Sequence, residues 1–302
     1  MAHALNTAMI FAAGRGERMR PLTDTCPKPL LAAGGKPLIV WQIERLAAAG
    51  IGRIVINHAW LGEQIEAALG DSARWGVELR YSAERDALET AGGIAQARYL
   101  YLIGDGVFVA VSGDVFCEFD YARLRDRASA LAASSDAGMH LAMVPNPPFH
   151  PKGDFALSAD GLLSLDGEPR HTFGNIGLYD TRMFRDLAPG TRRALTPYYR
   201  ETIAAGHASG KLYEGRWENV GAPAQFQALD TELRAALTLR CGTIWDASDG
   251  KMRSSSIFSG PRPQSCPTLA PIPFSRSPRS RRSTAATLPR PKCCVTGSPK
   301  PR

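Results

Sequence analysis

The first half of the chain alternates short apolar runs with longer stretches in which apolar residues recur at helical spacing. The apolar runs predict buried strands at residues 8–13, 54–56, 77–81 and 107–111. The amphipathic stretches between them predict helices at residues 36–49, 61–69 and 91–102. Strands that alternate with helices in this way are typical of βαβ units. The pattern therefore predicts an α/β fold with a mixed, mostly parallel sheet and helices on both faces.

The pattern changes near residue 139. Short strands separated by turns rich in Pro, Gly and Asp are predicted at residues 139–144, 154–157, 162–165 and 174–179. We expect them to form a small β subregion beside the main sheet, as a floor for a second substrate. Helices are predicted at residues 181–187, 194–205 and 223–237. The last of them begins with proline, which is favoured at the first helical position.

Hydrophobic periodicity stops after residue 239. Ten of the 22 prolines lie in residues 240–302, together with many Ser and Arg. Such a composition buries too little apolar surface to offset the chain entropy lost on folding. We expect a disordered basic tail, either a solvated extension or the product of a shifted reading frame. Residues 1–239 then form the folded domain, in two halves at 1–136 and 137–239.

The distribution of charge and the lengths of the apolar runs argue against two classes of binding partner, nucleic acids and membranes. The net charge is +7, but residues 1–240 hold 25 basic and 27 acidic residues, so the excess positive charge lies in the tail. We therefore expect no nucleic-acid partner for the folded domain. No run is long enough to cross a membrane and no basic cluster precedes the first strand, so we expect a cytoplasmic protein without membrane contact.

The stretch from residue 8 to residue 30 has the features of a phosphate-binding loop. A predicted strand leads into Gly14 and Gly16, where the backbone turns and approaches a ligand closely. Arg18 and Lys28 follow, and prolines on both sides of Lys28 restrict its backbone. Backbone N–H groups exposed by glycines, together with two cations, suit a polyphosphate.

Two common glycine motifs do not fit this loop. Met19 stands where the dinucleotide fingerprint has its third glycine, and Asn57 follows the second strand where an acid is expected. No Gly-Lys-Ser/Thr follows, so a P-loop is also excluded. A nicotinamide dehydrogenase is therefore disfavoured.

The loop has a specific family likeness. Residues 13–23 read A-G-R-G-E-R-M-R-P-L-T and residues 27–29 read P-K-P, which resembles the signature A-G-x-G-x-R-M-x-P-L-T…P-K-P of sugar-1-phosphate nucleotidyltransferases. The resemblance implies a Rossmann-like sheet of the nucleotide-diphospho-sugar transferase type, with nucleotide bound by residues 1–136 and sugar by 137–239. It implies that Arg18 and Lys28 are catalytic. The loop residues that it places against the nucleotide are Ala12, Ala13, Gly14 and Gly16.

Two further segments match the family's magnesium ligands. Asp114 follows the apolar strand at residues 107–111, and a carboxylate at that strand end suits Mg²⁺. It matches the family's metal-binding aspartate, with Gly113 beside the nucleotide. Residues 217–221, W-E-N-V-G, resemble the segment W-x-D-V-G that supplies the second metal contact. Asn219 replaces the aspartate there; an amide oxygen brings no charge, so we expect weaker Mg²⁺ binding.

Residues 88–93, L-E-T-A-G-G, resemble the family's base-binding segment, usually L-G-T-A-G. The resemblance places Thr90, Ala91 and Gly92 against the base. Glu84 stands where many relatives carry a glutamine that binds the pyrimidine N3–H. A carboxylate accepts that hydrogen and offers no donor, so Glu84 favours uracil or thymine over cytosine.

The form L-E-T-A-G-G-I is similar to that of N-acetylmuramate-1-phosphate uridylyltransferases of cell-wall recycling, and the resemblance covers about residues 8–237. On the sugar side it suggests Lys152, Asp154 and Asn175. We expect UTP and a sugar 1-phosphate to yield a UDP-sugar and pyrophosphate with Mg²⁺ as cofactor. Alternatives are a glucose-1-phosphate or mannose-1-phosphate enzyme using UTP, dTTP or GTP, and a catalytically silent nucleotide-sugar sensor. Oligomeric state stays open.

Overall fold

The computed structural model describes residues 5–70, 75–240, 243–246 and 251–254 of the 302-residue chain. By the density of its contacts the chain divides into residues 1–255 and 256–302, and the second unit lies outside the described residues. Among the helices that the structure describes, none is both long and apolar enough to cross a membrane.

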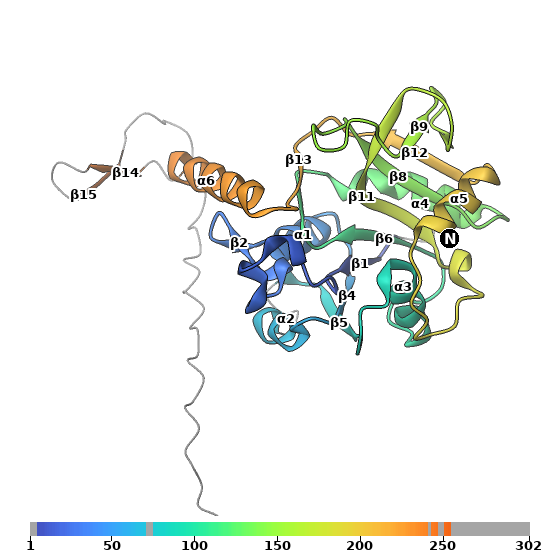
Figure 1. The fold of residues 1–302 in the computed structure, drawn as a ribbon, viewed down its shortest axis with the longest axis horizontal. Coiled ribbons are helices and arrows are strands. Elements are labelled where there is room, and N and C mark those ends of the chain that lie inside the picture. Colours follow the sequence, from blue (N-terminus) through green and yellow to red (C-terminus); the bar gives the residue numbers. More distant parts are fainter. Residues whose placement is uncertain (1–4, 71–74, 241–242, 247–250, 255–302) are drawn as a thin grey trace, which may run out of the picture. The chain divides into compact units, whose positions relative to one another are not determined.

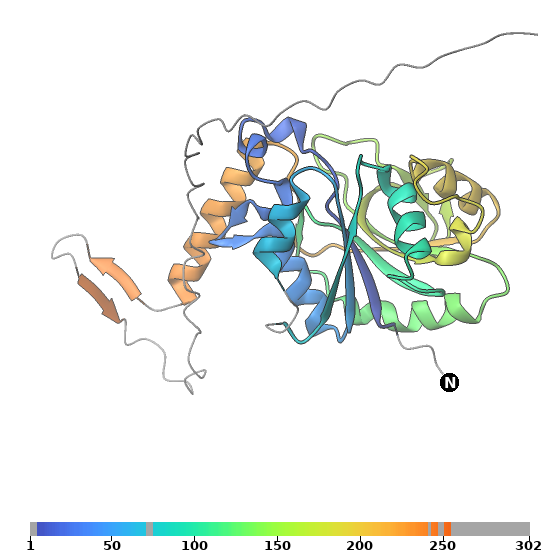
Figure 2. The same ribbon diagram turned by 90° about the horizontal axis from the view of Figure 1, so that it is seen from below.

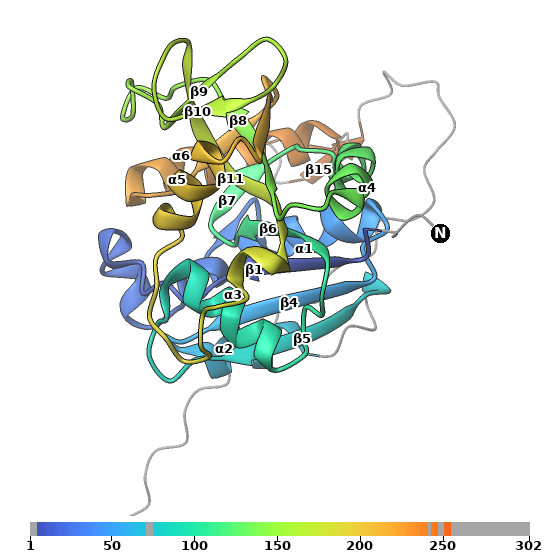
Figure 3. The ribbon, with the colours of Figure 1, turned by 90° about the vertical axis from the view of Figure 1, so that its right-hand side faces the viewer.

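A mixed sheet forms the centre of the fold. Its first part is parallel: β1 (Thr7–Phe11) lies between β4 (Arg53–His58) and β6 (Val107–Ser112), and β5 (Glu78–Ala83) pairs with the outer side of β4. Figure 3 shows these strands side by side. The parallel order confirms the α/β fold predicted from the alternating pattern.

The sheet continues beyond β6 with three more strands. The long strand β11 (Arg170–Asp180) pairs antiparallel to β6, β8 (Met139–Val144) pairs antiparallel to β11, and β12 (Ala208–Leu212) runs parallel to β8. Two stretches predicted for a separate subregion, residues 139–144 and 174–179, therefore extend the main sheet. The reason is that β8 and β11 are buried on both faces, as central strands must be.

Helices cover both faces of the sheet, as predicted (Figure 2). Successive strand residues point to opposite faces, so Ile10 and Ile56 join one core while Met9 and Val55 join the other. The first core is closed by α1 (Leu38–Ala48), α2 (Gly62–Leu69) and α4 (Arg125–Ala133), and the second by α3 (Glu89–Tyr99) and α5 (Thr196–Ala204).

The small β subregion is smaller than predicted. It consists of β9 (Phe155–Leu157), which pairs with the first residues of β11, and β10 (Leu163–Ser164), which pairs with β9. The register of β11 against β8 shifts between Phe173 and Gly177, and Asn175 there has a left-handed backbone (φ 56°). The part of β11 after this irregularity pairs with both β6 and β8, whereas the part before it pairs with β8 and β9.

A third apolar cluster joins the glycine loop to the C-terminal half. Met19 and Leu31 of the loop region pack with Phe116 of β7 (Val115–Cys117) and with Leu229 and Leu233 of α6 (Pro223–Arg240). β7 also pairs with β13 (Trp217–Asn219), and a short ribbon forms from β2 (Ala32–Ala33) and β3 (Lys36–Pro37). Figure 1 shows α6 beside β2.

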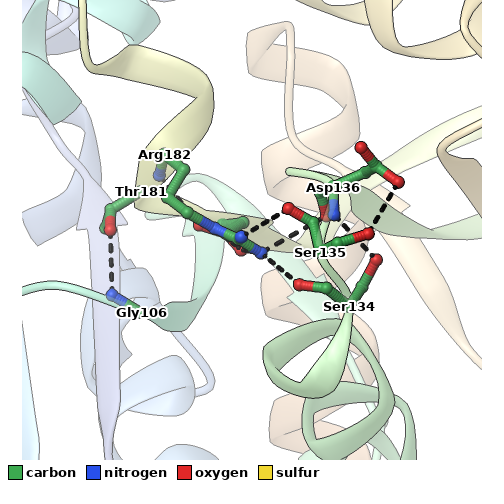
Figure 4. A network of polar contacts seen from close by, with 7 residues as sticks. Gly106, Ser134, Ser135, Asp136, Thr181 and Arg182 are labelled. Atoms are coloured by element: carbon green, nitrogen blue, oxygen red, sulfur yellow. Dashed lines mark hydrogen bonds and ion pairs between the residues drawn. The ribbon is translucent and has the colours of Figure 1, made fainter.

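Short 3₁₀ helices complete the described part of the fold: Glu17–Met19, Leu22–Asp24, Lys28–Leu30, Tyr121–Leu124 and Thr181–Phe184. The last replaces the helix predicted at 181–187. It begins a polar network in which Arg182 binds the Asp180 carboxylate and donates to the carbonyl oxygens of Ser134 and Ser135 at 2.9 Å each (Figure 4). The network holds the loop before β8 in place, at the end of the strands opposite to the one that Asp114 follows.

The structure describes two short strands where the sequence predicts a disordered tail. β14 (Thr243–Asp246) and β15 (Lys251–Ser254) pair as an antiparallel hairpin. The stretch holds Thr, Ile and Trp, which favour strands. The rest of the predicted tail, residues 255–302, lies outside the described residues.

Candidate active site

A cleft of about 510 Å³ opens at the carboxyl ends of β1 and β6. In a parallel sheet this edge is where ligands bind. Residues predicted from separate stretches of the sequence line it together: Ala12, Ala13, Gly14, Gly16, Arg18, Lys28, Thr90 and Asp114. We call this the first cleft.

The glycine loop closes tightly over Lys28. Gly16 has a left-handed backbone (φ 69°), and a Cβ atom there would lie 3.1 Å from side-chain carbons of both Lys28 and Thr23. The Thr23 hydroxyl donates to the Gly16 carbonyl oxygen at 2.8 Å. At Gly14, by contrast, no heavy atom lies within 4 Å of a built Cβ, so this position faces open space. Gly16 is thus needed by the fold, whereas Gly14 leaves room for a ligand.

Lys28 forms the main ion pair of the first cleft. Its side chain is buried, with 7% of the residue exposed, and its Nζ lies 2.5 Å from Asp114 Oδ2. Asp114 follows β6 directly, and Gly113 N donates to Phe11 O at 2.9 Å, which brings the ends of β6 and β1 together. A buried ammonium group requires a partner, so this pair holds Lys28 in place.

The three arginines of the loop have different surroundings. Arg18 is exposed and lines the first cleft, and its guanidinium lies near Gly221, 3.7 Å from a Cβ atom built there. Arg15 lies over the ring of Trp60 at 4.2 Å. Arg20 pairs with Asp24 at 2.6 Å, and the hydrogen bond that its guanidinium donates to that carboxylate raises the pKa of Arg20. Of these three arginines, Arg18 alone lines the cleft.

The predicted base-binding segment forms the start of α3. Glu89 has a left-handed backbone (φ 60°), a conformation that costs little only for glycine. The family's segment L-G-T-A-G usually has glycine at this position, and the left-handed backbone explains that preference. The Glu89 carboxylate pairs with Arg192 at 3.0 Å. Thr90 lines the cleft, but Ala91 is fully buried, and a Cβ atom on Gly92 would lie 2.3 Å from Thr191 O.

Glu84 lies beneath the cleft and is 6% exposed. One carboxylate oxygen accepts a hydrogen bond from Asn57 Nδ2 at 2.7 Å, and the other accepts from Leu88 N at 2.8 Å. Burial raises the pKa of Glu84. Asn57 in turn accepts from Ala12 N at 3.1 Å, so the relay joins β1 to the base segment. The direct contact of Glu84 with a base stays a prediction.

Sequence reasoning missed two members of this relay. The sequence places Asn57 just past the end of the second strand, where ligands bind, but predicts no partner for it, and it gives Gly93 no role beyond the base-binding segment. A Cβ atom at Gly93 would lie 2.7 Å from Asn57 Nδ2 and 2.8 Å from Glu84 Oε1. Nothing in a single sequence shows that these residues meet.

A second cleft of about 800 Å³ is formed by β9, β11, α5 and β13. Asp154 and Asn175 line this second cleft, whereas Lys152 is exposed and is not among its lining residues. Asp154 accepts hydrogen bonds from Phe173 N at 2.7 Å and lies 3.1 Å from His150 Nε2. The sequence analysis did not single out Arg200, which also lines this cleft.

One segment, residues 217–221, separates the two clefts. Asn219 pairs with Val115 across β13 and β7, and Val220 N donates to Asp114 O at 3.3 Å. Trp217 and Asn219 line the second cleft, and Gly221 lines the first. Residues 217–221 therefore border both clefts.

Comparison with known proteins gives a consistent result. The nucleotidyl transferase family profile matches residues 7–148. The chain is 48% identical over 217 residues to an N-acetylmuramate α-1-phosphate uridylyltransferase of Neisseria meningitidis, covering 71% of this chain and 92% of that protein. This chain belongs to the sugar-1-phosphate nucleotidyltransferase family.

Two more distant matches agree with this assignment. A Caulobacter vibrioides protein of the same name is 35% identical over 249 residues, which cover 78% of this chain and its own entire length. The solved structure of HddC from Yersinia pseudotuberculosis with GMP-PN superposes with a TM-score of 0.60 at 17% identity, covering 75% of this chain and 99% of that one. At that identity, the structural match supports the fold alone.

The donors near Asp114 suit the magnesium ion expected for this family. No group of three or more His, Cys, Asp or Glu side chains that could hold a metal occurs in the described part of the chain. Mg²⁺ is usually bound by one or two carboxylates together with substrate phosphates, and it favours oxygen donors. Asp114 supplies one such carboxylate at the first cleft, whereas Asn219 lines the second cleft, so a contact of Asn219 with the ion stays a prediction.

Proposed function

We propose that this nucleotidyltransferase transfers a uridylyl group from UTP to N-acetylmuramate α-1-phosphate in peptidoglycan recycling. The observation that carries the proposal is the convergence of Arg18, Lys28 and Asp114 on one cleft. The names of the two uridylyltransferase relatives supply the substrate pair. The activity belongs to residues 1–239, in the cytoplasm, where UTP is available.

The reaction needs positioning and charge neutralisation, not covalent catalysis. A phosphate oxygen of the sugar 1-phosphate attacks the α-phosphorus of UTP in line; the bond from that phosphorus to the β-phosphate oxygen breaks, and pyrophosphate leaves. Arg18, exposed at the mouth of the first cleft, binds the triphosphate and neutralises the leaving group. No proton transfer to carbon or covalent enzyme intermediate is required.

Lys28 is oriented before substrates arrive. Its ion pair with Asp114 fixes the ammonium in a nearly water-free position at the base of the cleft. We assign Lys28 to the α-phosphate and the incoming sugar phosphate, where it offsets negative charge on both reactants. Asp114, with Asn219 as the second predicted ligand, would hold Mg²⁺, and the ion would supply further charge neutralisation on the phosphates.

The remaining cleft residues position the nucleoside. The backbone from Ala12 to Gly16 offers N–H groups, and Gly14 leaves space beside them. Thr90 faces the base, while the relay of Asn57 and Glu84 holds the loop and the base segment at a fixed separation. In this proposal the sugar occupies the second cleft, with Asp154 and Asn175 along its wall.

A matrix of nucleoside triphosphates against sugar 1-phosphates tests the proposal, with pyrophosphate release as the readout. UTP with N-acetylmuramate α-1-phosphate should give the highest kcat/KM. A clear preference for GTP with mannose 1-phosphate, or for dTTP with glucose 1-phosphate, would replace the substrate assignment. Ligand binding by calorimetry without any Mg²⁺-dependent product would instead identify a sensor.

A further inference from the structure

The charged side chains of the second cleft differ in whether they already bind other groups of the protein. Arg170 donates to two backbone oxygens, Leu165 O at 2.7 Å and Asp154 O at 2.6 Å. His150 and Asp154 lie 3.1 Å apart as a pair. Arg200 lines the same cleft, is exposed, and its side chain forms no hydrogen bond or ion pair with another residue that the structure describes. It is therefore the cation that a ligand in this cleft meets without displacing a protein partner.

The position of Arg200 is fixed by the residue before it. Thr196, Tyr199 and Arg200 lie at helical spacing on one side of α5, and all three line the second cleft. The Tyr199 ring packs edge-on against Phe155 and Phe173 at 5.8 and 5.6 Å, and its hydroxyl lies 2.9 Å from that of Tyr179. These contacts anchor α5 against the cleft, so the backbone that carries Arg200 is held.

We propose that Arg200 is a specificity-determining residue that binds an anionic substituent on the sugar ring, namely a carboxylate such as the lactyl group of N-acetylmuramate. The inference rests on the proposed function and extends it to the choice of sugar. The anomeric phosphate is accounted for by Lys28 and the magnesium ligands across the wall at residues 217–221. A second anion on the sugar needs a second cation, and the guanidinium fork binds a carboxylate through two parallel hydrogen bonds.

Without Arg200, the second cleft would disfavour a carboxylate on the ligand. Asp154 and Asp166 also line it, so a carboxylate entering without a cationic partner meets negative charge. The ring of a neutral sugar, such as N-acetylglucosamine, carries no anionic group that could pair with Arg200. The residue therefore separates sugars that carry the lactyl acid from those that lack it.

Kinetics with a matched pair of acceptors test the proposal. The pair is N-acetylmuramate α-1-phosphate and its lactyl methyl ester, which keeps the shape and removes the charge. Wild-type protein should prefer the acid by about 10- to 100-fold in kcat/KM, the range for hydrogen bonds to charged groups. Arg200→Gln should abolish that preference through the KM for the acid, with kcat and the KM for UTP unchanged. Arg200→Lys should keep part of it.

Arg185→Gln is the matched control, because Arg185 is also exposed but lines neither cleft. It should retain the wild-type preference, and thermal melting should show that all variants are folded. If wild-type protein uses the acid but Arg200→Gln keeps the wild-type ratio, or if wild-type protein shows no preference, this inference alone is wrong. If wild-type protein releases no pyrophosphate from UTP with either acceptor, the proposed function fails as well.

Discussion

The two clefts lie on either side of one strand but are built in different ways. The first is made from a continuous loop, a strand end and a helix start, and its central charges, Lys28 and Asp114, are already paired. The second is made from side chains of β9, β11, α5 and β13, which are far apart in the sequence. In our proposal the first cleft carries the chemistry shared by the family, and the second carries the choice of sugar.

The largest expected effect comes from removing a cation of the first cleft. Arg18→Ala and Lys28→Ala should each lower kcat by about 10²–10³-fold or more, because the charge that they neutralise develops in the transition state. Arg20→Ala is the matched control, since Arg20 lies in the same loop but pairs with Asp24 outside the cleft. Near-normal turnover in either of the first two variants, measured by pyrophosphate release, would refute their catalytic assignment.

Changing the second cleft should affect one substrate only. Asp154→Ala removes the acceptor of Phe173 N and the partner of His150. Losing those hydrogen bonds loosens the wall before Asn175, so the KM for the sugar 1-phosphate should rise about 10-fold. The KM for UTP, measured in the same assays, should stay within error of wild type. An equal rise for both substrates would show that the clefts are not separate sites.

Substitutions at two glycines, Gly93 beside the relay of Asn57 and Glu84 and Gly14 in the first cleft, distinguish support of the fold from ligand contact. Gly93→Ala places a methyl group 2.7 Å from Asn57 Nδ2 and should destabilise the fold by about 1–3 kcal/mol, less the helix preference of alanine. Gly14→Ala meets no atom and should leave stability unchanged while raising the KM for UTP. Urea unfolding and steady-state kinetics measure the two effects; a reversed pattern would contradict the assignments of both glycines.

The smallest effect concerns the wall between the clefts. Asn219→Asp adds a negative charge beside Asp114 and restores the residue usual in the resembling segment. We expect the half-saturating Mg²⁺ concentration to fall roughly 3- to 10-fold, on the order of 1 kcal/mol. Mn²⁺ binding followed by electron paramagnetic resonance gives a readout independent of turnover. Unchanged metal affinity would show that residue 219 is not a ligand.

Local patterns predicted most of the sheet and its helices. The runs at 8–13, 54–56 and 107–111 became β1, β4 and β6 because apolar strands of that length are stable only inside a covered sheet. Strand β12 and helix α4 were not predicted. α4 has a single fully buried residue, Ala128, so its apolar periodicity is weak. The partners of β8 and β11 also depend on contacts that no local pattern encodes.

Most lining residues of the first cleft can be predicted from the sequence alone, because glycines, prolines and cations in one short stretch restrict the backbone and concentrate the charge. Asp114 is far from that loop in the sequence, but a second short motif at a strand end indicates it. Three other features require the folded chain: Glu84 supports the loop, Lys152 stays outside the second cleft, and Arg200 lines it. These outcomes depend on which distant side chains meet, and long-range packing sets that, not local conformational preference.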